Sequence, residues 1–149
     1  MPDRILVVDD EQDIRDLVAA TLEDEGYECN KAEDGSAALK VLDSSQPFDL
    51  IITDLQMPKL TGLEFLSKVR EQNISTPVIV LTAYGSKESA IEALRLGAYD
   101  FLEKPFNIPE LLDHIKSAVE YNKQTLNKIA FLESKRKAAQ RQHQKIAIR

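Results

Sequence analysis

The fold and the chemistry of this 149-residue chain centre on the stretch Asp49-Leu50-Ile51-Ile52-Thr53-Asp54-Leu55-Gln56-Met57-Pro58. Its apolar run, rich in β-branched residues, predicts a short buried strand that ends at Asp54. Pro58 opposes continuation of that strand because proline has no amide hydrogen to donate to a sheet. Since open parallel sheets bind ligands at the carboxyl ends of their strands, Asp54 is a candidate functional residue. Taken alone, it is more simply interpreted as a capping or turn aspartate.

Strand-like and helix-like patterns alternate along the rest of the chain. Further strands are predicted at 5–8, 27–31, 78–81 and 99–102. Helices are expected near 14–22, 37–42, 61–69 and 86–96, and a last, extended helix opens near Asn107. This alternation predicts an α/β fold with a doubly wound, five-stranded parallel sheet. Right-handed crossovers favour the flavodoxin-like strand order 2-1-3-4-5.

Acidic and basic residues are unevenly divided along the chain. The formal net charge is −6, but residues 1–120 carry −13 and residues 121–149 carry +7. We therefore expect an acidic domain at 1–120 and a basic helical segment at 121–149, either a solvated linker or a short coiled coil. The coiled coil depends on a seam with three-four spacing: Ile115, Val119, Asn122, Leu126 and Ile129.

Targeting and redox signals are few. The sequence has no recognisable signal peptide and no apolar run of membrane-spanning length. Its one cysteine, Cys29, permits no internal disulfide and suits a reducing compartment. We expect a cytoplasmic protein without membrane contact. Nucleic-acid binding by this chain is not favoured, because no DNA-binding motif accompanies the basic end.

The ends of four predicted strands carry matching chemistry. Asp9 and Asp10 follow the first strand, Asp54 ends the third, Thr82 ends the fourth and Lys104 follows the fifth. In the order 2-1-3-4-5 the first and third strands are neighbours, so their carboxylates converge and repel one another unless a cation neutralises them. Oxygen-only ligands favour Mg²⁺ or a similar hard divalent ion. Carboxylate, metal, hydroxyl and lysine together predict a phosphoryl-transfer site.

These motifs resemble those of the receiver domain of two-component response regulators. The resemblance covers about residues 4–120 and rests on Val7-Val8-Asp9-Asp10-Glu11, on Asp54-Leu55-Gln56-Met57-Pro58 with Gly62, on Thr82-Ala83 and on Lys104-Pro105-Phe106. It implies that residues 1–120 are a phosphoacceptor domain that acts as a switch, not an enzyme with an external substrate.

The resemblance also implies a role for each site residue. Asp54 would accept a phosphoryl group from a sensor histidine kinase or a phosphotransfer protein. Asp10, Asp54 and the backbone carbonyl of Gln56 would bind Mg²⁺ directly, and Asp9 would act mainly through water. Lys104 would pair with the phosphoryl oxygens.

The same resemblance extends to the switch. Thr82 would move toward the phosphoryl group, and the Lys104-Pro105 bond would be cis. Phe101 matches the position of the switch aromatic, although an ordinary core aromatic is the alternative. We also expect Gln56 and Tyr84 to set the lifetime of the aspartyl-phosphate, because each lies two residues past a key site residue.

The expected output is a change in the face made by the fourth helix, the fifth strand and the fifth helix. That face would control homodimerisation or a downstream output domain not present in this chain. Two enzyme-like alternatives fit less well. A haloacid-dehalogenase-type hydrolase expects an aspartate where Gln56 stands, and a flavodoxin expects Ser, Thr and Gly after the first strand, where this chain has Asp-Asp-Glu. A degenerate receiver is disfavoured because every expected site residue is present.

Overall fold

The computed structural model describes the backbone of residues 2–44, 46–83 and 85–148 and the side chains up to residue 143. The strands are β1 (Arg4–Val8), β2 (Glu28–Ala32), β3 (Leu50–Asp54), β4 (Val78–Thr82) and β5 (Asp100–Glu103). The helices are α1 (Gln12–Asp24), α2 (Gly35–Ser44), α3 (Gly62–Glu71), α4 (Lys87–Arg95) and α5 (Ile108–Ile148). All the predicted strands are present, with bounds within one residue of the expected ones.

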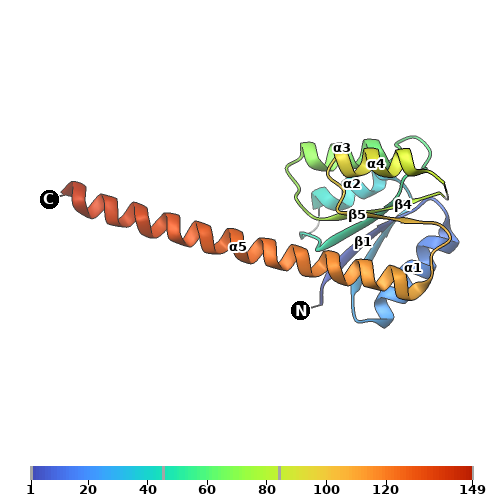
Figure 1. The fold of residues 1–149 in the computed structure, drawn as a ribbon, viewed down its shortest axis with the longest axis horizontal. Helices are drawn as coiled ribbons and strands as arrows, with labels where there is room; N and C mark the ends of the chain where they lie inside the picture. Colours follow the sequence, from blue (N-terminus) through green and yellow to red (C-terminus); the bar gives the residue numbers. More distant parts are fainter. Residues whose placement is uncertain (1, 45, 84, 149) are drawn as a thin grey trace.

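The strands form one parallel sheet in the order β2-β1-β3-β4-β5, which confirms the predicted topology. Helices α2, α3 and α4 cover one face of the sheet, and α1 and α5 cover the other (Figure 1). Successive strand residues point to opposite faces, so Leu6 and Val8 pack in one cluster and Ile5 and Val7 in the other. Burial on both faces explains why the three central strands β1, β3 and β4 are mostly apolar, whereas the edge strands β2 and β5 are more polar and only partly buried.

Helix α3 begins next to the carboxyl end of β3 because of two local features. Thr61 and Glu64 form the capping box that their spacing predicts, with each side chain accepting the other residue's backbone amide at 3.2 Å. Gly62 is buried, and a Cβ atom there would lie 2.3 Å from the carbonyl oxygen of Asp54. Only glycine lets the helix approach this backbone so closely.

Helix α5 runs without interruption past residue 120 and extends far from the globule (Figure 1). Its first part is core: Ile115 is 0%, Val119 4% and Asn122 7% exposed. The Nδ2 group of Asn122 donates to Oδ1 of Asp49 at 3.3 Å. The predicted five-residue seam is therefore wrong for these three positions, because each is already packed within its own chain. Leu126 and Ile129 are 51% and 44% exposed.

Candidate functional site

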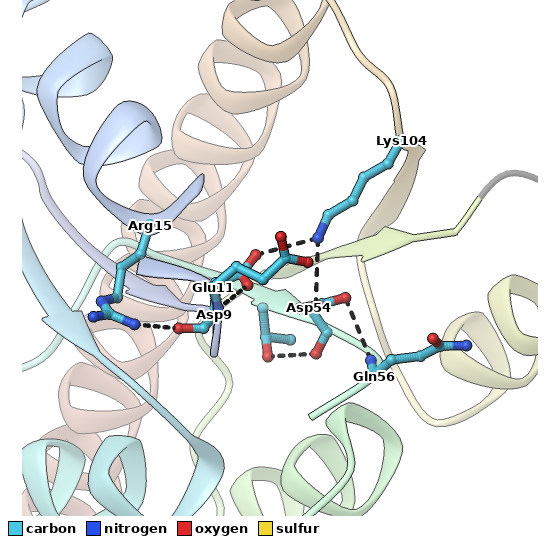
Figure 2. A network of polar contacts seen from close by, with 7 residues as sticks. Asp9, Glu11, Arg15, Asp54, Gln56 and Lys104 are labelled. Carbon is cyan, nitrogen blue, oxygen red and sulfur yellow. Dashed lines mark hydrogen bonds and ion pairs between the residues drawn. The ribbon is translucent and has the colours of Figure 1, made fainter. Parts of the chain in front are cut away.

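Asp54 is the last residue of β3 and is 5% exposed. Its Oδ1 atom accepts a hydrogen bond from the backbone amide of Gln56 at 3.3 Å, and its Oδ2 atom lies 3.4 Å from the Nζ atom of Lys104 (Figure 2). The strand end and the turn that follows it therefore fix the carboxylate at the sheet edge where ligands bind in this fold.

Asp9 directly follows β1 and is completely buried. Its Oδ1 atom accepts from the amide of Glu11 at 2.9 Å, and its Oδ2 atom accepts from Lys104 at 3.3 Å. Because β1 and β3 are neighbours in the sheet, one lysine bridges the two aspartates (Figure 2). The Lys104-Pro105 peptide bond is cis, as the resemblance implies.

The electrostatics of the site show an excess of negative charge. Burial raises the pKa of the Asp54 carboxyl above its ordinary value; Lys104 lowers it, and Asp9 raises it further. Burial alone would lower the pKa of Lys104, but Asp54 and Asp9 together raise it. One ammonium is thus shared by more carboxylate than it neutralises.

A third carboxylate joins the two aspartates. One oxygen from each of Asp9, Glu11 and Asp54 lies within 4.8 Å of the others, the single such acidic group found among the described residues. Asp10 is exposed and is not a member of this group. Glu11 was missed as a site residue in the sequence, although it completes the Asp-Asp-Glu run. The oxygen-only donor set fits a hard divalent cation.

The hydroxyl of Thr82 is the site's unsatisfied group. Thr82 ends β4, is 1% exposed, and its Oγ1 atom has no hydrogen-bond partner among the described residues. A buried hydroxyl without a partner costs free energy, so its presence at a ligand edge indicates a polar ligand.

The remaining predicted site residues have different surroundings. The Gln56 side chain is exposed next to the site (Figure 2). Phe101 in β5 is half-buried and packs against the cluster beneath α2, α3 and α4. Tyr84 lies outside the described residues.

Fold and site together define a class: a flavodoxin-like module with a lysine-bridged aspartate pair at the topological switch point. The family model for the response regulator receiver domain matches residues 5–116. The chain belongs to this family, and it is a receiver domain of two-component signalling.

The most similar proteins include longer regulators. The nitrogen assimilation regulatory protein NtrX of Azorhizobium caulinodans is 43% identical over 118 residues, which is 78% of this chain and 26% of that protein. The crystal structure of NtrX from Brucella abortus has a TM-score of 0.80 at 40% identity, covering 85% of this chain and 29% of that one. A receiver domain from Clostridium thermocellum has a TM-score of 0.77 at 32% identity, covering 83% and 98%. The chain thus spans about a quarter of the curated relatives it matches.

Within the described residues, no helix combines the length and the hydropathy that crossing a membrane requires.

Proposed function

We propose that Asp54 accepts a phosphoryl group from the phosphohistidine of a histidine kinase or of a phosphotransfer protein. A carboxylate oxygen of Asp54 forms the new bond to phosphorus as the phosphorus–nitrogen bond breaks, and the electron pair stays on the imidazole nitrogen. The observation that most directly supports this proposal is the lysine bridge, in which Lys104 pairs with both Asp54 and Asp9 at one edge of the sheet. Fixed position and fixed charge are what phosphoryl transfer needs.

The donor set supports Mg²⁺ as the cofactor. Asp10, Asp54 and the Gln56 carbonyl are the proposed direct ligands, with Asp9 acting mainly through water and Glu11 as a further candidate. When bound, the ion neutralises the phosphoryl oxygens and the carboxylates around them.

Lys104 and Thr82 are proposed to bind the transferred group. Lys104 is placed to pair with phosphoryl oxygens because its ammonium lies 3.4 Å from the acceptor carboxylate. Thr82 has a buried hydroxyl that can donate to one of those oxygens and so gain its missing partner. Gln56 and Tyr84 are proposed to control attack by water and hence the phosphate lifetime.

The output is proposed to be a change in the face formed by α4, β5 and α5. A shift of Thr82 would let Phe101 reorient, because their strands are neighbours in the sheet. We propose that this face, with exposed Leu126 and Ile129 of α5, controls homodimerisation or a downstream output domain. The family supports a cytoplasmic location.

Intact-mass measurement after incubation with acetyl phosphate and Mg²⁺ tests the proposal. We expect one added phosphoryl group in the wild type, none in Asp54→Asn, and none when the metal is chelated. Asp43→Asn, which changes an exposed aspartate in the last turn of α2, is the control and should be modified normally. Modification of Asp54→Asn at the wild-type rate would overturn the assignment.

A further inference from the structure

Arg15, in the first turns of α1, contacts the site from the side opposite Lys104 (Figure 2). Its Nη1 group donates a hydrogen bond of 2.7 Å to the backbone carbonyl oxygen of Asp9. The Arg15 side chain is half-buried and touches none of the carboxylates through the hydrogen bonds and ion pairs of the described residues. It therefore reaches the site through the main chain.

The Asp9 carbonyl needs such a partner. The β1 ladder ends at Val8, which pairs with Ala32 and Thr53, so Asp9 lies just beyond the last paired residues. The Asp9 amide still donates to the Ala32 carbonyl at 3.2 Å. Its carbonyl is past the sheet, and among the residues that the structure describes Arg15 of α1 gives it the one hydrogen bond it receives.

Every polar group of Asp9 is consequently held. The amide binds β2, one carboxylate oxygen binds the Glu11 amide, the other binds Lys104, and the carbonyl binds Arg15. Three of these partners belong to the sheet or to the acidic site itself. Arg15 is the one that can be altered without changing a carboxylate, the lysine or the sheet.

We propose that Arg15 is a positioning residue for the divalent-cation site: by fixing the Asp9 carbonyl, it sets the turn that directs Asp9 and Glu11 toward Asp54. This inference rests on the proposed function. Outer partners of metal ligands commonly change metal affinity by 10- to 100-fold. The lower end applies here because Asp9 keeps three other hydrogen bonds.

A positioning role and a purely electrostatic role of Arg15 predict opposite changes in Mg²⁺ affinity when Arg15 is replaced by an uncharged residue. Removing a positive charge near a cation site should strengthen cation binding by Coulomb's law. Releasing the Asp9 backbone should weaken it, because the carboxylates are then less well aligned. The sign of the change in Mg²⁺ affinity therefore separates the two.

The test measures Mg²⁺ binding by titration calorimetry in wild type, Arg15→Met, Arg15→Lys and the control Arg95→Met, which removes an exposed arginine of α4. We expect Arg15→Met to raise the dissociation constant about tenfold. Arg15→Lys should recover part of the loss, and the control should match the wild type. Without metal, the Glu11 amide should exchange its hydrogen faster in Arg15→Met, as seen by NMR.

Tighter or unchanged Mg²⁺ binding in Arg15→Met would overturn the inference. If that variant does not fold, Arg15→Lys is measured instead. An Arg15→Lys variant with wild-type Mg²⁺ affinity and wild-type exchange of the Glu11 amide would also overturn the inference. A wild type that binds no Mg²⁺ overturns this inference as well. If the wild type binds Mg²⁺ but Asp54 is not phosphorylated, the proposed function fails. The Mg²⁺ affinities of the Arg15 variants still test the inference in that case.

Discussion

Gly62 and Gly35 offer a matched pair of glycine-to-alanine substitutions. Each is the buried first residue of a helix, α3 and α2 respectively. A Cβ atom at Gly62 would lie 2.3 Å from the Asp54 carbonyl oxygen and 2.5 Å from the Leu55 Cα atom. A Cβ atom at Gly35 would lie 2.7 Å from Cδ2 of Leu60, the movable end of a half-buried side chain.

Gly62→Ala should lower the free energy of unfolding, whereas Gly35→Ala should leave it nearly unchanged. Alanine for glycine in a helix gains up to about 1 kcal/mol when nothing collides. At Gly35 the Leu60 side chain can rotate, so the net change should stay within about 1 kcal/mol of zero. At Gly62 the colliding atoms are backbone, so overpacking costs about 1–3 kcal/mol. In Gly62→Ala the 2.9 Å hydrogen bond from the residue-62 amide to the Leu55 carbonyl would also be strained, which costs about 1 kcal/mol more.

Urea unfolding of Gly62→Ala and Gly35→Ala, each followed by phosphorylation with acetyl phosphate, measures both consequences. After the helix-propensity gain is subtracted, we expect Gly62→Ala to lose about 1–4 kcal/mol of unfolding free energy. We also expect slower phosphorylation, since helix α3 would push the Asp54 backbone out of place. Equal stability losses in the two variants, or a fully stable Gly62→Ala, would refute this steric argument.

Three further outcomes can be measured. Because burial raises the folded-state pKa of Asp54, ionising it opposes folding above that pKa. In chelator, Asp54→Asn should therefore have a larger free energy of unfolding than the wild type at pH 7. This stability difference should shrink on acidification as Asp54 becomes neutral. Urea unfolding curves in which the difference grows at lower pH would contradict the prediction. Burial raises the pKa of the Cys29 thiol to about 11. Iodoacetamide at pH 8 should therefore alkylate Cys29 about a hundredfold more slowly in the folded protein than in the urea-unfolded chain. Similar alkylation rates in the two states would contradict the raised pKa. A chain ending at Glu120 lacks Asn122 and its bond to Asp49, and should melt several degrees below one ending at Thr125; calorimetry showing equal melting temperatures would count against that contact.

Local patterns in the sequence were sufficient to predict the sheet and most of the site. Apolar runs that stop at a polar residue define both a buried strand and the ligand edge, so Asp54, Thr82 and Lys104 could be located together. The turn after β1 could not be predicted in this way. Asp10 and Glu11 are chemically similar neighbours, and which of them faces Asp54 depends on the backbone direction after Asp9.

The tail shows a different limit. The three-four pattern through Asn122 has the spacing of a coiled coil, and a sequence window contains nothing that distinguishes a partner chain from the protein's own core. The contact that decides the matter joins Asn122 to Asp49, which lies 73 residues away in the chain. Long-range contacts of this kind become visible only once the sheet and α5 are assembled.

The length of α5 beyond the globule has a mechanical consequence. Asn122 bonds to Asp49, and Lys123 pairs with Asp3 at 3.2 Å, so the helix leaves the globule at the edge opposite Asp54. From there to Ile148 the helix is about 39 Å long at 1.5 Å per residue. Used as a lever, it would carry its tip about 7 Å for a tilt of about 10° at that exit point. A modest tilt of α5 would thus become a displacement larger than a helix turn at the far end.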